Sequence, residues 1–157
     1  MKHGDPKSVI EAARSEHTHL RRIMADIGSG APNVPPNIKA LLGEFADALR
    51  RHLELEDECL YPDLCSTSNA VLRRKARRYQ LHMGGIAEGF ALFCKRWRET
   101  DIASSSARFW EDWKTLESAL LQRMESEDRD LYPAATEELA QKTQERRNDS
   151  AQGGGIR

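Results

Sequence analysis

The sequence predicts an all-α protein, an up-down-up-down bundle of four helices. Three observations favour this fold class. Four long segments each repeat apolar residues at three- and four-residue spacing, which is the period of an amphipathic α-helix. No segment shows the period of two that a half-buried β-strand requires. Charged residues make up 31% of the chain and aromatic residues only 6%, a composition that favours helix over sheet.

Loop-forming residues separate the four segments. A stretch rich in Gly and Pro over 28–36 ends the first segment. Tyr61-Pro62 and the polar residues before Ala70 end the second, and a Ser-rich break over 101–106 ends the third. The predicted helices span 6–27, 36–60, 69–99 and 106–131. Because the connections are short, neighbouring helices are expected to run antiparallel.

The C-terminal part of the chain is expected to add little to the bundle. A shorter segment over 134–146 is a candidate fifth helix. The last residues, 148–157, contain three consecutive glycines and are predicted to form a disordered tail. The sequence therefore predicts one domain over 1–147 followed by that tail.

Length and charge exclude several classes of protein. The 157 residues are enough for one domain, and 24 basic against 25 acidic residues give a formal charge of −1. A nucleic-acid-binding protein usually has a strong basic excess, so no nucleic-acid partner is expected. No apolar run is long enough to cross a membrane, and the first residues lack the core of a secretory signal. Three cysteines without CxxC spacing (Cys59, Cys65 and Cys94) favour a reducing cytoplasm.

An eleven-residue frame occurs twice in the chain. HLELEDECLYP over 52–62 and RMESEDRDLYP over 123–133 share the pattern x-x-E-x-E-D-x-x-L-Y-P and lie 71 residues apart. His17 and His82 lie 65 residues apart, each in the helix before one copy of the frame. The repeat indicates two copies of one helical hairpin, packed about a pseudo-twofold axis.

Polar residues interrupt the apolar stripes at positions that the pattern assigns to the core: His17, His52, Glu56, His82, Arg123 and Glu127. A buried ionised carboxylate is unfavourable unless it is paired or binds a metal. Imidazole and carboxylate ligands without thiolate suit iron, manganese or zinc. The pattern therefore favours a metal site over the alternative, which is a metal-free ion network of Glu56, Arg123 and Glu127.

These motifs resemble the hemerythrin-like (HHE cation-binding) domain over about residues 10–135. The resemblance rests on a His in the first helix, H-x-x-x-E followed by L-Y-P in the second, a His in the third and E-x-x-x-L-Y-P in the fourth. It implies a four-helix bundle with non-haem di-iron, in which two carboxylates bridge the metals, and a role in binding or sensing oxygen or nitric oxide, or in handling iron. By this resemblance the metal ligands are His17, His52, Glu56, His82 and Glu127.

Arg123 departs from the family pattern, which has a second H-x-x-x-E in the fourth helix. A guanidinium stays protonated and cannot bind a cation. Either Arg123 occupies the second metal position and leaves one metal on His17 and His52, or it swings out and two metals bind. We favour the first outcome. Tyr79, one turn before His82, is a candidate replacement ligand, although a core tyrosine is the more common finding at such a position.

The sequence therefore predicts a cytoplasmic metal-binding protein with iron, as one or two ions, or else manganese or zinc. Its expected partner is a small diatomic such as oxygen or nitric oxide. The third helix lacks the second histidine of oxygen-carrying hemerythrins, so reversible oxygen carriage is not expected. No nucleophile–base pair or phosphate-binding loop is present, and any enzymatic activity would be redox chemistry at the metal. The alternative is a metal-free bundle that acts as an interaction module, with Arg123 neutralising Glu56 and Glu127.

Overall fold

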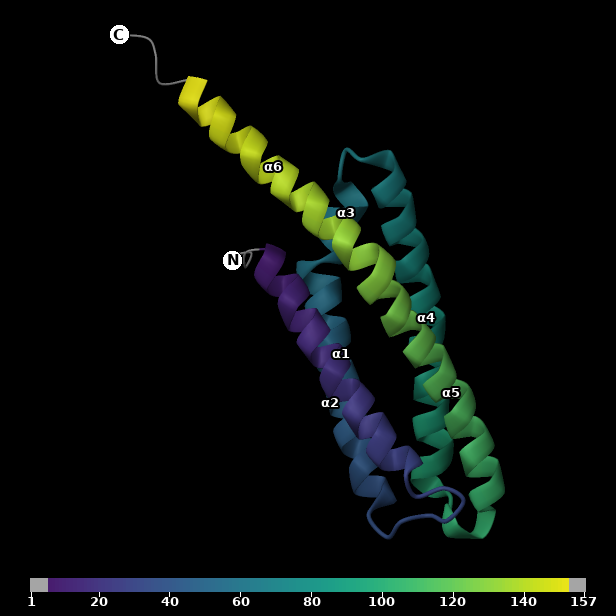
Figure 1. The fold of residues 1–157 in the computed structure, drawn as a ribbon. Coiled ribbons are helices and arrows are strands. Elements are labelled where there is room, and N and C mark those ends of the chain that lie inside the picture. The colour runs from purple at the N-terminus through teal and green to yellow at the C-terminus, as the bar shows by residue number, and fades with distance from the viewer. Residues whose placement is uncertain (1–5, 153–157) are drawn as a thin grey trace.

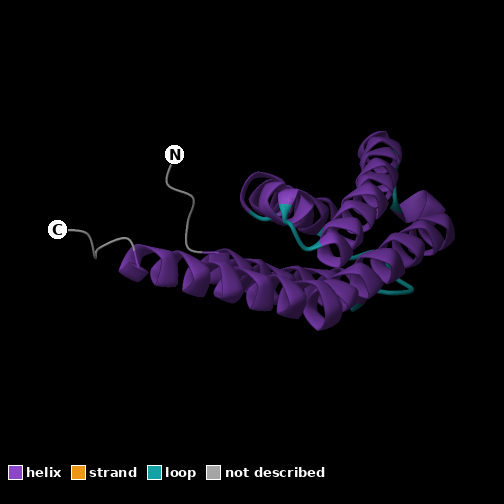
Figure 2. Ribbon diagram, turned by 90° about the horizontal axis from the view of Figure 1, so that it is seen from above, coloured by secondary structure: helices purple, strands orange, loops and turns teal. Residues whose placement is uncertain are grey.

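A computed structural model describes residues 6–152. In this part of the chain every regular element is helical, and Figure 2 shows helices joined by loops with no strand among them. Four long helices form the bundle: α1 (Pro6–Gly28), α2 (Ile38–Cys59), α4 (Ala70–Glu99) and α5 (Ser106–Ser126). Short elements join them: α3 (Tyr61–Ser66) and the 3-10 turn η1 (Ala103–Ser105). The predicted fold class is confirmed.

The helices pair as two hairpins. In Figure 1, α1 lies along α2, and α4 lies along α5. Asn69 fixes the start of α4, because its side chain caps the helix by accepting a hydrogen bond from Leu72 N (3.1 Å). Among the described residues, no helix has the length and hydropathy needed to cross a membrane.

The C-terminal segment differs from the sequence prediction. Helix α5 continues through a π-helical turn, η2 (Glu127–Leu131), into α6 (Tyr132–Gln152). A proline ring crowds the carbonyl four residues earlier, and the wider π turn ahead of Pro133 accommodates it. The fifth helix is therefore longer than the expected 134–146. The predicted disordered tail is wrong for residues 148–152, which are helical, and 153–157 lie outside the described residues.

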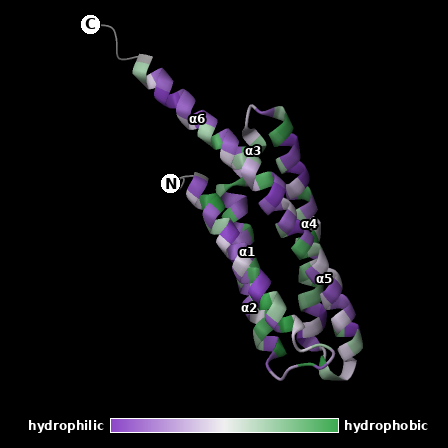
Figure 3. Ribbon diagram, in the orientation of Figure 1, coloured by the Kyte–Doolittle hydropathy of each residue, from purple (hydrophilic) through white to green (hydrophobic). Residues whose placement is uncertain are grey.

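Helix α6 extends beyond the bundle (Figure 1). Figure 3 shows that its outer part is mostly hydrophilic, and its residues from 143 to 151 are exposed. Nearer the bundle, Glu138 accepts hydrogen bonds from Thr67 Oγ1 and Asn69 Nδ2. This contact holds the first half of α6 against the loop between α3 and α4.

Two apolar clusters form the core, and a polar layer lies between them. Along α1, Ala13 belongs to one cluster and Leu20 to the other, with His17 between them. Because α2 runs antiparallel to α1, the order is reversed there: the polar residues lie between Leu49 of the second cluster and Leu60, just after the end of α2, of the first. The polar residues that interrupt the apolar stripes of α1, α2 and the α5–η2 segment therefore meet at one level.

Candidate metal centre

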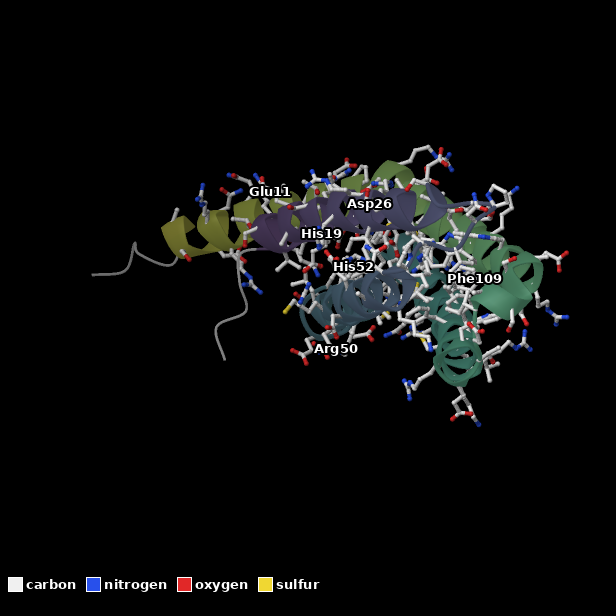
Figure 4. All side chains as sticks on the ribbon, turned by 90° about the horizontal axis from the view of Figure 1, so that it is seen from below. Glu11, His19, Asp26, Arg50, His52 and Phe109 are labelled. Carbon is white, nitrogen blue, oxygen red and sulfur yellow. The ribbon has the colours of Figure 1, made fainter. Side chains whose placement is uncertain are left out.

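Four of the five predicted ligands converge in the polar layer. His17, His52, Glu56 and Glu127 are each 0–3% exposed. His17 Nε2 lies 3.1 Å from His52 Nε2 and 3.2 Å from Glu127 Oε2, and His52 Nε2 lies 3.6 Å from Glu56 Oε2. Ligand atoms of His17, His52 and Glu127 all lie within 4.8 Å of one another, so this His/His/Glu group could hold a metal ion. Figure 4 shows His52 where α2 faces α1, whereas Arg50 lies on the outer side of α2.

A carboxylate outside the cluster orients each imidazole. His17 Nδ1 lies 3.0 Å from Asp128 Oδ1, and His52 Nδ1 lies 3.2 Å from Glu16 Oε2. An ionised carboxylate only accepts hydrogen bonds, so Nδ1 of each ring carries a proton, and in the tautomer in which imidazole binds a metal Nε2 provides the lone pair. Metal-binding histidines commonly show this carboxylate–imidazole pairing.

Burial keeps His52 neutral. Desolvation, with the nearby His17 adding to it, lowers the pKa of His52 to about 4. Asp128 remains ionised, because burial raises its pKa but Arg21 and His17 outweigh burial and hold the value low. Arg21 donates to Asp128 Oδ2 at 2.8 Å, and Arg14 donates to its backbone oxygen at 3.1 Å. Asp128, whose carboxylate pairs with His17, is thus anchored to α1 by two arginines.

The inward-facing side of the cluster is rich in lone pairs. His17 Nε2 and His52 Nε2 lie 3.1 Å apart, and Glu127 Oε2 and Glu56 Oε2, each near one of these nitrogens, accept no other hydrogen bond from the described residues. Buried polar atoms are nearly always hydrogen-bonded, and lone pairs that face one another repel. A cation beside them could be held by the two nitrogens and Glu127 Oε2, with Glu56 Oε2 3.6 Å from His52 Nε2. Two imidazole nitrogens and carboxylate oxygens fit iron, manganese or zinc.

The two carboxylates differ in charge state. Burial, reinforced by the charge of Glu127, raises the pKa of Glu56 to about 8. Burial also acts to raise the pKa of Glu127, but His17 and Arg123 outweigh it, and the pKa of Glu127 is lowered. Without a metal, Glu127 is therefore the ionised member of the pair and Glu56 holds a proton at neutral pH.

Each tyrosine of the repeated L-Y-P element reaches the carboxylate of the other copy. Tyr61 OH donates to Glu127 Oε1 (3.3 Å), and Tyr132 OH donates to Glu56 Oε1 (2.7 Å). The internal repeat was the only sequence signal for these tyrosines, and the sequence prediction left them out of the site. Asp128 also belongs to the repeated frame and was left out of the predicted site, whereas Glu16 had no such signal.

Arg123 lies in the core beside Glu127. Its side chain is 3% exposed, and its Nε donates to Glu127 Oε1. Its Nη2 donates to Tyr61 OH (2.6 Å), and its guanidinium carbon lies 4.4 Å from the centre of the Tyr79 ring. The hydroxyl of Tyr79 donates to the backbone oxygen of Ser126 (3.3 Å). Tyr79 therefore supports the guanidinium with its ring, and its hydroxyl is not directed at the cluster as a replacement ligand would be.

His82 does not join the cluster, and the expectation that it faces the interior is wrong. Its side chain is exposed and lies at a groove between α4 and α5. The residues that α4 buries include Ala76, Met83 and Ile86. The buried face of α4 passes from Ala76 to Tyr79 in three residues and from Tyr79 to Met83 in four. It therefore reaches Met83, one position after His82. The difference of one residue turns the side chain about 100° around the helix.

A small cavity adjoins the cluster. Its polar wall includes His52, Arg123 and Glu127, and its apolar wall includes Leu49 and Met83. It offers about 10 Å³ to the centre of a water-sized molecule. This is close to the least volume that holds one water. The cavity therefore has room for about one molecule the size of water.

The raised pKa of Glu56 predicts a pH dependence of stability in the metal-free protein. Unfolded Glu56 is ionised above its ordinary value of 4.5, but folded Glu56 keeps its proton to about 8. The folded state then binds more protons than the unfolded state, so stability falls as the pH rises through this window. His52 opposes this trend only below about 6.5, where its unfolded form takes up a proton.

We therefore expect the free energy of unfolding in chelator to fall by on the order of 1–2 kcal/mol between about pH 6.5 and 8. Urea unfolding at the two pH values measures the change. Glu56→Gln, which keeps the shape of the side chain but cannot titrate, is expected to remove it. If the free energy of unfolding of Glu56→Gln changed with pH as much as that of wild type, the pH dependence would belong to another group.

Comparison with known proteins identifies this arrangement with one family. Residues 8–135 match the family described as the hemerythrin HHE cation binding domain. This range contains the four long helices of the bundle, apart from the first two residues of α1, and every residue of the cluster. No curated protein and no solved structure gives a significant match.

Proposed function

The chain belongs to the hemerythrin HHE cation-binding domain family, and we propose that it binds iron in the polar layer and uses it to bind or sense oxygen or nitric oxide. The single observation that carries this proposal is the close approach of His17 Nε2, His52 Nε2 and Glu127 Oε2 in a buried layer, a group that could hold a metal ion. Buried nitrogen and carboxylate groups this close together are stabilised when a shared cation joins them.

The residues of such a metal site would have different roles. His17, His52 and Glu127 would hold the metal, with Glu56 beside them. Asp128 and Glu16 fix which imidazole nitrogen carries the proton, and so they aim both Nε2 atoms at one point. Tyr132 OH, 2.7 Å from Glu56 Oε1, holds that carboxylate in place. Bound iron would supply a coordination position for a small ligand and the capacity to change oxidation state.

The neighbouring cavity supports a diatomic ligand. It lies against His52 and Glu127, and its volume suits a molecule about the size of water. Leu49 and Met83 give it apolar walls, which favour an uncharged ligand such as oxygen or nitric oxide over an anion. Three free cysteines agree with the cytoplasmic location that we propose.

The alternative is a metal-free bundle that acts as an interaction module. The ion pair of Arg123 with Glu127 favours it, because this pair neutralises one buried carboxylate without a metal. This pair does not include the imidazole nitrogens of His17 and His52, which lie 3.1 Å apart. Metal binding accounts for their placement beside Glu127, and for that reason we favour it.

Metal content and thermal stability distinguish the two functions. Protein purified without chelator is expected to contain iron, and chelation is expected to lower its melting temperature. At a free metal concentration of about 100 times Kd, binding stabilises the fold by about 2.7 kcal/mol, or roughly 5–10 °C for a chain of this size.

Two histidines of α1 provide the matched variants. His17→Ala removes a buried histidine of the cluster, whereas His19→Ala removes an exposed one two residues away. Chelation should shift the melting temperature of His19→Ala as it does in wild type, and it should have little effect on His17→Ala. Protein that contains no metal and melts identically with and without chelator would favour the interaction module.

A further inference from the structure

The internal repeat provides two half-sites, and the second is filled by the chain itself. In the first copy the core residues are His17, His52 and Glu56, and the equivalent residues of the second copy are His82, Arg123 and Glu127. We infer that this protein binds one metal ion per chain, and that the guanidinium of Arg123 is a tethered cation in the place of a second ion. The inference rests on the proposed metal binding and concerns its stoichiometry.

The guanidinium is fixed from three directions. Arg123 Nε donates to Glu127, Nη2 donates to Tyr61 OH at 2.6 Å, and the ring of Tyr79 covers the group at 4.4 Å. The side chain is 3% exposed, so it is not one that extends its charged end to solvent. A guanidinium with a carboxylate on one side and an aromatic face on another has two of its most favourable contacts.

The carboxylate oxygens are already divided between the metal position and protein donors. A carboxylate that bridges two metals gives one oxygen to each. Here Glu127 turns Oε2 toward His17 and gives Oε1 to Arg123 and Tyr61. Glu56 turns Oε2 toward His52 and gives Oε1 to Tyr132. The oxygen of each carboxylate that would bind a second ion is therefore used by a hydrogen-bond donor.

The second half-site also lacks nitrogen ligands. His82 is exposed, and the adjacent buried position holds Met83. Met83 lines the same small cavity as Arg123 and Glu127, so its side chain lies on the side where a second histidine would be needed. Charge works in the same direction. Two ionised carboxylates and one guanidinium carry a net charge of −1, so a single divalent cation is enough to make the group positive. A second divalent cation would be repelled by the fixed positive charge of the guanidinium at close range.

Anaerobic titration of the metal-free protein with Fe²⁺, followed by elemental analysis, tests the stoichiometry. Wild type is expected to bind one iron per chain. After oxidation it should give the electron paramagnetic resonance signal of an isolated high-spin Fe³⁺ ion rather than the silent spectrum of a coupled pair. Arg123→Lys keeps the charge and is the matched control, expected to stay at one iron.

Variants that supply the missing ligands are expected to restore the second ion. Arg123→His should raise the count toward two, with a weakly held second iron, and Met83→His combined with Arg123→His should bind two irons firmly. Circular dichroism checks that each variant is folded. Two irons in wild type, or one iron in the folded double variant, would overturn the inference while metal binding stands. No iron in wild type would overturn the proposed function itself.

Discussion

Replacing His52 by alanine is expected to lower iron affinity by more than about 100-fold. Changing a residue that only orients a metal ligand commonly costs 10–100-fold, and His52 is placed to be a ligand itself. Its Nε2 lies 3.1 Å from that of His17, and its ring is oriented by Glu16. The variant loses one nitrogen ligand, and it also loses the contact of the His52 ring with the imidazole of His17.

Competition with a chelator of known affinity measures this effect. Glu16→Gln is the matched variant, because it leaves the imidazole in place but weakens its orientation. The iron affinity of Glu16→Gln is expected to lie between that of wild type and that of His52→Ala. An affinity of His52→Ala within about threefold of wild type would mean that the metal binds elsewhere on the chain.

Replacing Arg123 by methionine is expected to destabilise the metal-free protein by about 3–5 kcal/mol. Arg123 and Glu127 are 3% and 1% exposed, and they form a buried ion pair. Removing the guanidinium leaves the Glu127 carboxylate buried without its arginine partner, and a buried charge that has lost its partner is far more costly than an apolar pair. Methionine fits the volume of the arginine stem, so the cavity contribution to the loss should be small.

A double-mutant cycle separates the lost charge pairing from altered packing. Urea unfolding in chelator is measured for Arg123→Met, Glu127→Gln and the combination of both. The combined variant should recover most of the stability that Arg123→Met loses, since the amide carries no charge. A combined variant as unstable as the sum of the single ones would show that the ion pair contributes little.

The fold was predictable because its determinants are local. The 3/4 spacing of apolar residues defines each helix, and short breaks between segments define their antiparallel order. Boundaries agree closely with prediction, as for α1 at Pro6–Gly28 and α4 at Ala70–Glu99. The continuation of α5 into α6 was not predicted, because a proline such as Pro133 normally stops a helix, and here it follows the π turn over Glu127–Leu131.

The site was predictable where burial alone decides it. His17, His52, Glu56 and Glu127 stand in apolar stripes, and the structure brings them together. The roles of their outer partners were not predicted, although Asp128 belongs to the repeated frame, because Glu16 and Asp128 each lie next to a stripe residue, about 100° around the helix. Whether such a residue touches a neighbouring imidazole depends on how the helices pack, and the chain pattern carries no record of it.

His82 shows the sensitivity of a site prediction to helix register. The long helix α4 drifts against a fixed pattern, and one residue decides whether a side chain is buried or exposed. Met83 is 8% exposed while His82 is fully on the surface side of the helix. The pseudo-symmetry of the two hairpins therefore extends to the carboxylates and tyrosines but not to this histidine.

Anomalous X-ray diffraction at the iron absorption edge, from crystals loaded with Fe²⁺, tests the metal centre most directly. We expect one iron peak per chain in the polar layer. It should lie about 2.0–2.2 Å from His17 Nε2, His52 Nε2 and Glu127 Oε2, as metal–nitrogen and metal–oxygen bonds require. Density with no iron in the polar layer, or with iron only at exposed histidines such as His19 and His82, would contradict a metal centre at this site.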